Sequence, residues 1–347
     1  MKIAIYSKNF YPSIGGVEIT SMILANVLDE LGYNTKVITE TPLNGKNEIE
    51  TKFCIRRVNN ILSFIVSILS SDLVIVKGGI SLKAGLFCVI FRKKIINYFE
   101  MHGPVLIEGN NIADLIKNIL IKVILMNSSM NVGVSDSCLN SKGKILKKIK
   151  IYNPINSELT QHNYTNSKAK KYDILFVGRL IRSKGIMLLL DSLMILEKKK
   201  KELFVCIVGD GEEMRNIINE INKFEYIKFD LWGSTEHQKL KRAYLDSKFV
   251  VFPSIQPEGM GLVLIESLFF GLPVIVSDQE ASIEVIGDAG VVVKTGDVED
   301  LSAKIECLTN DNEIVQILSE RAIKRSELFS LNEYKNKISY MLNEIIN

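Results

Sequence analysis

The sequence predicts an α/β protein with two doubly wound parallel-sheet domains, and three observations lead to this class. Short apolar segments of strand length alternate with longer segments of helical periodicity, and this alternation occurs twice along the chain. The polar stretch 151–171 separates the two series and contains few core-forming side chains. The length of 347 residues suits two domains of about 150 to 180 residues each.

The first series predicts a parallel sheet within domain 1–155, and residues 156–171 are predicted to link it to the second domain. Its opening strand, helix and second strand have the order and length of a β-α-β unit. The predicted elements are a strand over 3–6, a helix over 19–28, and strands over 35–39, 73–76, 95–98 and 130–134.

The second series predicts another parallel sheet, within domain 172–330, followed by an amphipathic helix over 331–347. Helix and strand patterns alternate throughout this domain. The predicted elements are strands over 173–177, 203–208, 226–229, 249–252, 274–276 and 291–293, and helices over 185–196, 235–246 and 262–270.

Composition excludes several classes of protein. Hydrophobic residues make up 47% of the chain and charged residues 24%, which is enough for a sizeable core and excludes disorder. Five widely spaced cysteines without a C-x-x-C pair, and only three histidines, disfavour a disulfide framework or a metal site. No uncharged apolar run reaches about 18 residues, and the N-terminal segment lacks the apolar core of a signal peptide. We therefore expect a cytoplasmic protein.

Segment 253–273 carries the strongest functional pattern. A strand predicted to end at Phe252 leads into a loop with Glu258, and a helix begins near Gly261. Glycine permits close approach of a ligand, and free amides at a helix N-terminus favour phosphate. If the whole stretch from Glu258 to Glu266 were helical, the two residues would be about 12 Å apart, wider than the roughly 5–9.5 Å of a glycosidase pair. The two carboxylates therefore suit hydroxyl groups at opposite ends of a ligand with phosphate between them.

The alternative for this segment is an ordinary loop acid followed by a solvated helix residue. Against that alternative, Glu266 lies between the apolar segments 263–265 and 268–270. A carboxylate in so apolar a helix needs a partner. We therefore favour the functional interpretation.

Basic residues follow the first strand of the second domain. Gly178, Arg179 and Lys184 lie between strand 173–177 and the next helix. A guanidinium and an ammonium group at the carboxyl end of a strand neutralise a diphosphate well. The alternative is a solvated basic turn.

Two weaker patterns follow strands of the first domain. Gly15 and Gly16 follow the first strand, and His102 with Gly103 follows strand 95–98. A plain turn would look the same as the glycine pair, and a lone histidine is more often structural than catalytic. The G-x-G-x-x-G fingerprint is absent, which disfavours a dehydrogenase.

In order and spacing these motifs resemble the retaining glycosyltransferases of family 4, the "glycosyl transferases group 1", which have the GT-B fold. The resemblance implies two Rossmann-like domains that face each other across a cleft, with the final helix packing back on the first domain. It covers nearly the whole chain. The motifs that carry it are Gly15-Gly16, His102-Gly103, Gly178-Arg179, Lys184-Gly185, Gly209-Asp210-Gly211, Pro253-Ser254, the pair Glu258 and Glu266, and Gly271 to Asp278.

The resemblance implies transfer of a sugar from a nucleotide-diphosphate donor with retention of the anomeric configuration. The glutamate that matches Glu258 contacts the donor sugar, and the one that matches Glu266 binds the ribose hydroxyls. Arg179 and Lys184, next to Gly178, match the cations that stabilise the leaving diphosphate. We predict that Glu258, Arg179 and Lys184 are catalytic, together with His102, which matches a histidine near the donor sugar.

Further substrate contacts follow from the resemblance. In the first domain Gly15 and Gly16 match backbone that contacts the phosphates. In the second domain, backbone contacts to sugar and diphosphate fall on Gly259, Met260, Gly261 and Leu262.

The resemblance also implies a hexosyl or N-acetylhexosaminyl transferase that builds a bacterial surface glycan such as lipopolysaccharide, capsule or exopolysaccharide. Fixed cations replace a divalent ion, so we predict that the enzyme needs no metal and no other cofactor. Two departures affect the donor: Met260 stands where the family often has Phe, and residues 279–284 lack a frequent glycine pair. Two rivals remain, a GT-B-like nucleotide-sugar epimerase and a non-catalytic sugar-nucleotide-binding subunit.

Charge is distributed unevenly, with net +9 over residues 1–170 and net −6 over 171–347. We expect the basic half to bind a glycan or lipid-linked acceptor. Segments 112–126 and 142–150 suggest peripheral contact with an anionic membrane, at the inner face of the plasma membrane. The alternative for them is a core helix and a solvated basic helix. No nucleic-acid partner is expected, because aromatic and basic residues are not interleaved.

Overall fold

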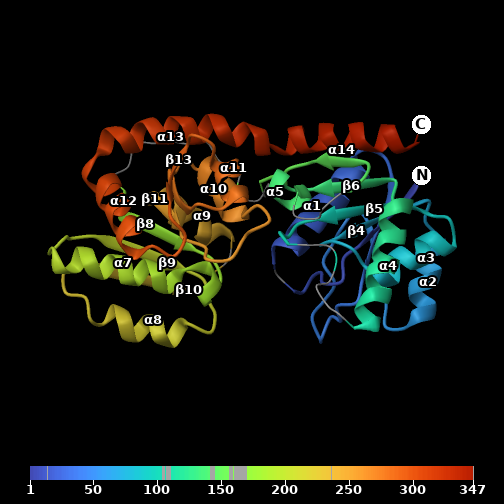
Figure 1. Ribbon diagram of the computed structural model, residues 1–347, viewed down its shortest axis with the longest axis horizontal. Coiled ribbons are helices and arrows are strands. Elements are labelled where there is room, and N and C mark those ends of the chain that lie inside the picture. Colours follow the sequence, from blue (N-terminus) through green and yellow to red (C-terminus); the bar gives the residue numbers. More distant parts are fainter. Residues whose placement is uncertain are drawn as a thin grey trace. The chain divides into compact units, whose positions relative to one another are not determined.

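The computed structural model describes residues 1–13, 15–103, 106, 111–140, 145–155, 159, 170–235 and 237–346. The chain divides into two compact units, which are residues 1–154 with 332–347, and residues 155–331. Each unit contains one parallel sheet flanked by helices (Figure 1). The prediction of two doubly wound α/β domains is confirmed.

The sheet of the first unit has seven strands in the order β3-β2-β1-β4-β5-β6-β7, and all of its pairs are parallel. Its strands are β1 (Lys2–Tyr6), β2 (Asn34–Thr39), β3 (Cys54–Arg57), β4 (Leu73–Lys77), β5 (Lys94–Phe99), β6 (Met130–Gly133) and β7 (Lys148–Lys150). Its helices are α1 (Gly16–Glu30), α2 (Ile61–Leu69), α3 (Leu82–Ile90), α4 (Ile112–Asn127) and α5 (Asp136–Asn140).

The sheet of the second unit has six parallel strands in the order β10-β9-β8-β11-β12-β13. They are β8 (Tyr172–Val177), β9 (Phe204–Val208), β10 (Lys228–Gly233), β11 (Ser247–Phe252), β12 (Val274–Ser277) and β13 (Gly290–Val293). The helices are α7 (Ile186–Lys198), α8 (Met214–Ile221), α9 (His237–Leu245), α10 (Leu262–Phe269), α11 (Glu280–Ile286), α12 (Val298–Asn310) and α13 (Asn312–Ser326), with short 3-10 turns η1 (Arg182–Lys184) and η2 (Glu327–Phe329).

Both sheets reverse their strand order beside the first strand of the unit. The reversal falls between β1 and β4 in the first unit and between β8 and β11 in the second. The central strands are buried along nearly their whole length, as the continuous apolar runs of β4 and β12 require. In open α/β sheets ligands bind at the carboxyl ends of the strands beside such a reversal. The loops after these four strands are therefore where function is expected.

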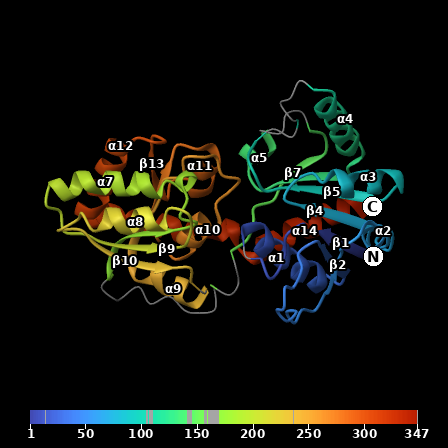
Figure 2. The same ribbon diagram turned by 90° about the horizontal axis from the view of Figure 1, so that it is seen from below.

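The C-terminal helix α14 (Leu331–Ile346) packs on the first unit, which it rejoins from residue 332. The buried hydroxyl of Tyr98 lies 3.4 Å from that of Tyr334. Near the end of the helix, the ammonium group of Lys94 donates to the carbonyl of Ile345 at 2.7 Å. Figure 2 shows the helix passing behind the strands of this unit.

The structure corrects two local expectations. The strand predicted over 226–229 runs instead from Lys228 to Gly233. Of the basic segment 142–150, residues 142–144 lie outside the described residues, and Lys148–Lys150 form the edge strand β7 rather than a helix. Most of the predicted linker 156–171 also lies outside the described residues.

Candidate functional site

The centre of the candidate site is an ion pair between the loops that follow β8 and β11. The ammonium nitrogen Nζ of Lys184, in η1, lies 2.5 Å from Oε1 of Glu258. These two strands flank the reversal of the second sheet, so parallel pairing brings both loops to the same edge. The side chains of Lys184 and Glu258 remain 21% and 16% exposed, which leaves both groups within reach of a ligand.

Two polar side chains hold the loop that carries Glu258. The hydroxyl of Ser254 donates to Oε1 of Glu258 at 2.7 Å. The side-chain amide of Gln279 donates to the carbonyl of Ser254 at 2.7 Å and accepts from the backbone amide of Glu258 at 3.3 Å. Gln279 thus fastens both ends of the loop, a role that its sequence neighbourhood did not indicate.

The approach of the two loops requires glycine at position 185. Gly185 has φ +74°, and a Cβ atom there would lie 1.9 Å from the carbonyl oxygen of Pro253. No side chain fits in that space. Gly185 therefore sets the distance between the loop of Lys184 and the loop of Glu258.

Helix α10 begins within the same segment and directs free amides toward its N-terminal end. Gly261 precedes the helix with φ +79° and supplies no side-chain cap. The amide of Leu264 donates to the carbonyl of Gly261, whereas the amides of Leu262 and Val263 have no acceptor among the residues that the structure describes. Free amides and the helix dipole make this end attractive to phosphate.

Glu266 lies on α10, and its carboxylate is largely shielded from water. The hydroxyl of Tyr244, on α9, donates to Oε2 of Glu266 at 2.7 Å. Burial raises the pKa of Glu266 to about 7, while this hydrogen bond acts in the opposite direction. The hydrogen-bond partner expected for Glu266 in its apolar helix is thus Tyr244, 22 positions earlier.

The other predicted site residues of the second unit differ in their exposure and in their contacts. Arg179 is exposed, and its guanidinium makes no hydrogen bond or ion pair with any described residue. The carbonyl oxygen of Gly178 packs against Gly209, since a Cβ atom on Gly209 would lie 1.8 Å from it. Met260 is 3% exposed and Gly259 is also buried.

In the first unit, the predicted residues follow β1 and β5. The Nδ1 atom of His102 lies 2.8 Å from the hydroxyl of Ser137 on α5. Gly15 caps α1, which begins at Gly16, and the carboxylate of Glu18 folds back to within 2.5 Å of where a Cβ of Gly15 would lie.

A buried ion pair that the sequence did not predict lies next to His102 in the chain. The ammonium group of Lys77, at the end of β4, lies 2.7 Å from Oε1 of Glu100, and the two side chains are 0% and 4% exposed. The hydroxyl of Thr20 donates to the same oxygen at 2.6 Å. The second oxygen of Glu100 is buried and has no hydrogen-bond partner among the described residues. The sequence signal was a lysine that ends an apolar strand and precedes Gly78-Gly79.

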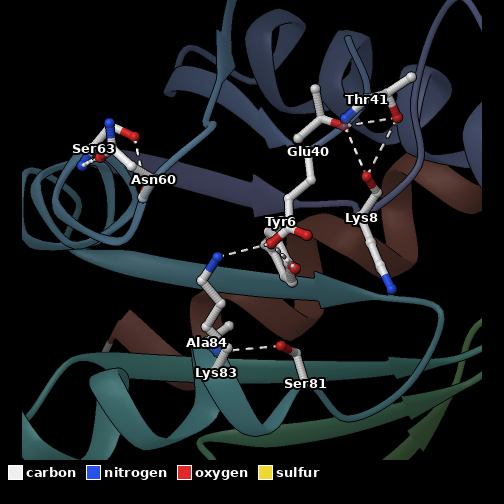
Figure 3. A network of polar contacts seen from close by, with 10 residues as sticks. Tyr6, Lys8, Glu40, Thr41, Asn60, Ser63, Ser81, Lys83 and Ala84 are labelled. Atoms are coloured by element: carbon white, nitrogen blue, oxygen red, sulfur yellow. Dashed lines mark hydrogen bonds and ion pairs between the residues drawn. The ribbon is translucent and has the colours of Figure 1, made fainter.

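A second polar network of this unit lies where β1 and β2 end (Figure 3). Both the hydroxyl of Tyr6 and the ammonium group of Lys83 bind Oε1 of Glu40, at 3.0 and 2.9 Å. Lys83 lowers the pKa of Glu40, and burial with the adjacent carboxylate raises the pKa of Tyr6. This network ties α3 to the sheet.

A pocket of about 500 Å³ opens elsewhere in the second unit, beside α9. None of the predicted site residues lines it. Its charged groups are engaged in part with one another, since Arg242 pairs with Asp246. The residues that line it are Lys171, Tyr172, Trp232, Ser234, Thr235, Lys239, Arg242 and Asp246.

Within the described part of the chain, no group of three or more His, Cys, Asp or Glu side chains is placed to hold a metal ion. The same residues include no helix with the length and hydropathy needed to cross a bilayer.

The fold of the chain is shared with solved structures. Anabaena HepE in complex with UDP superposes with a TM-score of 0.80 at 18% identity, over 99% of this chain and 100% of that one. Sucrose-phosphate synthase of Thermosynechococcus elongatus superposes with a TM-score of 0.77 at 17% identity, over 99% of each chain. These likenesses show that the chain has the GT-B fold that its motifs predicted.

Sequence comparison supports the same class. A family model described as "Glycosyl transferases group 1" matches residues 157–325. An uncharacterized glycosyltransferase of Haemophilus influenzae is 25% identical over 340 residues, which cover 92% of this chain and 94% of the relative. An N-acetyl-D-galactosaminyltransferase of Campylobacter jejuni, which acts on an undecaprenol-linked glycan, is 27% identical over 53% of this chain and 52% of its own length. The fold and these matches support a glycosyltransferase.

Proposed function

We propose that the protein is a retaining glycosyltransferase of family 4 that moves a sugar from a nucleoside-diphosphate donor to a glycan or lipid-linked acceptor. The observation that carries the proposal is the contact between Lys184 and Glu258 at the reversal of the second sheet. The free amides that begin α10 and the shielded carboxylate of Glu266 follow within the same segment.

The order of these groups fits the order of groups in a nucleotide sugar. Glu258 accepts hydrogen bonds from the hydroxyls of the donor sugar, and the amides of Leu262 and Val263 face the diphosphate. Glu266, further along α10, accepts from the ribose hydroxyls. A carboxylate with a pKa of about 7 is a good acceptor once two hydroxyl groups and Tyr244 donate to it.

Negative charge develops on the diphosphate as it leaves, and fixed cations stabilise that charge. Lys184 is held in place by Glu258, whereas Arg179 is exposed and makes no ion pair with the described residues. Arg179 therefore binds a phosphate without first giving up a protein partner. We propose that these two cations do the work of a divalent ion, so that the reaction requires no metal.

The reaction exchanges one bond at the anomeric carbon for another on the same face. The oxygen of the acceptor hydroxyl forms a bond to this carbon as the bond to the diphosphate oxygen breaks. The proton of the acceptor hydroxyl moves to the departing diphosphate, so the protein supplies no separate base. Within the first unit, we propose that His102, positioned by Ser137, and the backbone of Gly15 and Gly16 bind substrate groups.

The names of the relatives support the substrate class. HepE and the pneumococcal GtfA were solved with UDP, and relatives include a capsular polysaccharide glycosyltransferase of Staphylococcus aureus and an O-antigen mannosyltransferase of Escherichia coli. We propose a hexose or N-acetylhexosamine donor and a role in surface polysaccharide assembly.

A thermal-shift screen against UDP-, GDP-, ADP- and dTDP-sugars tests the donor. A nucleotide sugar at 100 times its dissociation constant stabilises the fold by about 2.7 kcal/mol. The donor so found is then incubated with and without glycan acceptors, and release of nucleoside diphosphate is measured. Release that depends on acceptor supports the proposal, conversion of the sugar without acceptor identifies an epimerase, and binding without either reaction identifies a non-catalytic subunit.

A further inference from the structure

Helix α4 exposes an unbroken apolar stripe to solvent. At 100° per residue the members of this stripe fall within an arc of about 100°, so they share one side of the helix. Ile112 and Met126, near its two ends, are 77% and 75% exposed. The α4 stripe consists of Ile112, Leu115, Ile116, Ile119, Val123 and Met126.

The α4 stripe is distinct from the side by which the helix joins the protein core. Ile121 and Ile124 are buried on the opposite side. Ile124 approaches α3 so closely that a Cβ on Gly85 would lie 2.5 Å from its Cδ1 atom. The helix is therefore anchored through one apolar face and presents a second apolar face whose side chains remain 36% to 77% exposed.

Helices α2 and α3 extend the exposed apolar surface. The three helices lie side by side, with α3 in the middle (Figure 1). Leu62 and Val66 of α2 are 71% and 65% exposed, and Ile90 at the end of α3 is 66% exposed. Asn60 caps α2 by accepting from the amide of Ser63 (Figure 3). The surface is thus built on capped helices rather than on a loop.

The segments that form this surface carry more basic than acidic residues, although Lys83 is paired with Glu40 and Lys94 binds the carbonyl of Ile345. Across segments 61–69, 82–94 and 111–127 the only acidic residue is Asp114, and it lies 3.6 Å from Lys117. The basic residues of the same segments are Lys83, Arg92, Lys93, Lys94, Lys117 and Lys122. Two copies of this face would repel one another, whereas an anionic surface would attract it.

We propose that the α4 stripe, with the exposed apolar side chains of α2, inserts into the interface of an anionic lipid bilayer. A helix with one apolar face and bordering lysines lies in the plane of a membrane with that face among the acyl chains. The basic residues add attraction to anionic headgroups. This goes beyond the proposed transfer reaction, since it concerns where the first unit is held and not what the second unit binds.

The test is flotation of the full chain with vesicles of phosphatidylcholine alone or mixed with phosphatidylglycerol. Wild type is expected to float with the mixed vesicles and only weakly with phosphatidylcholine. Ile116→Gln with Ile119→Gln is expected to lower partitioning at least about tenfold, because two isoleucines no longer enter the acyl region. Lys117→Gln with Lys122→Gln is expected to lower it about fivefold for each charge removed.

The matched control is Ile218→Gln with Ile317→Gln, two isoleucines that are each 43% exposed on helices of the second unit. This control is expected to float like wild type, and circular dichroism of all variants is expected to match wild type. Failure of wild type to float with anionic vesicles would overturn the proposal. Unchanged flotation of the variant Ile116→Gln with Ile119→Gln would also overturn it. So would the finding that wild type is a dimer and that this variant is a monomer. Because the assay contains no nucleotide sugar, its failure leaves the proposed reaction untouched.

Discussion

Lys184 and Glu258 come from the loops after β8 and β11, 74 positions apart in the sequence, and meet at 2.5 Å. Their contact places a cation and a carboxylate at the point where the strand order of the sheet reverses. Such a point lies outside the carboxyl ends of the strands, where helix N-termini also converge. The pair therefore links the architecture of the second unit to its proposed chemistry.

Replacing Lys184 by alanine is expected to lower kcat about 10²- to 10³-fold, the usual loss when one fixed group that stabilises transition-state charge is removed. The fold is expected to survive, since Ser254 still donates to Glu258. Nucleoside-diphosphate release under saturating donor measures the loss. Lys199→Ala is the control, because Lys199 also pairs with a glutamate, Glu306, but on the surface. Comparable activity in both variants would contradict the assignment of Lys184 to the catalytic site.

Stability is expected to depend on pH through Glu266. Burial raises its pKa from 4.5 to about 7, so the folded chain binds this proton more tightly than the unfolded chain. The stability that Glu266 contributes is then fully present below pH 4.5 and is lost as the pH rises through 7. At about 1.4 kcal/mol per pKa unit, the loss is about 3 kcal/mol.

Glu266→Gln is expected to abolish this dependence, because its side chain carries no charge. Relative to wild type, the variant gains stability between acidic and mildly alkaline pH, as calorimetric midpoints across that range will show. Glu212→Gln, at an exposed position of the same unit, corrects for general loss of charge. Parallel curves for wild type and Glu266→Gln would mean that Glu266 is not shielded as the structure has it.

Gly185→Ala is expected to unfold or strongly destabilise the second unit. The new Cβ would lie 1.9 Å from the carbonyl oxygen of Pro253, and the loops of Lys184 and Glu258 would have to separate. Gly296→Ala is the matched control, with a similar φ of +78° and no atom within 4 Å of its Cβ. The control carries only the cost of a left-handed backbone, about 1 kcal/mol. Thermal midpoints measure both, and equal losses would contradict the packing argument.

Most of the strands could be predicted from the sequence, for a physical reason. Buried parallel strands are nearly continuous apolar runs, so β1, β8 and β12 stand out. In contrast, β3 was missed, because this edge strand reads Cys-Ile-Arg-Arg and has no buried residue. Edge strands face water and lose the apolar signal.

The hydrogen-bond partners of the candidate site residues could not be predicted from the sequence. Nothing near Tyr244 or Gln279 indicates that the first binds Glu266 and the second fastens the loop of Glu258. These contacts join helices and loops that only the packed sheet brings together. Glu266 was recognised because a carboxylate within an apolar helix is costly, but that cost does not say which residue offsets it.

The buried pair of Lys77 and Glu100 offers a test of the first unit. Desolvation lowers the pKa of Lys77, and Glu100 opposes that effect. Lys77→Met removes one partner and leaves a carboxylate that is 4% exposed, with Thr20 still donating to it. Removal of one member of a buried pair costs about 3–5 kcal/mol. We therefore expect a clear fall in the thermal midpoint.

Removing both charges is expected to cost less than removing one. In Lys77→Met with Glu100→Leu no charge is left buried, so the double variant is expected to recover part of the stability lost by Lys77→Met. Lys335→Met is the control, because Lys335 forms a partly exposed pair with Glu30 in the same unit, and such pairs contribute about 1 kcal/mol or less. A double variant less stable than Lys77→Met would mean that the pair stabilises the unit as a pair. The fold beside His102 would then depend on this charge contact and not merely tolerate it.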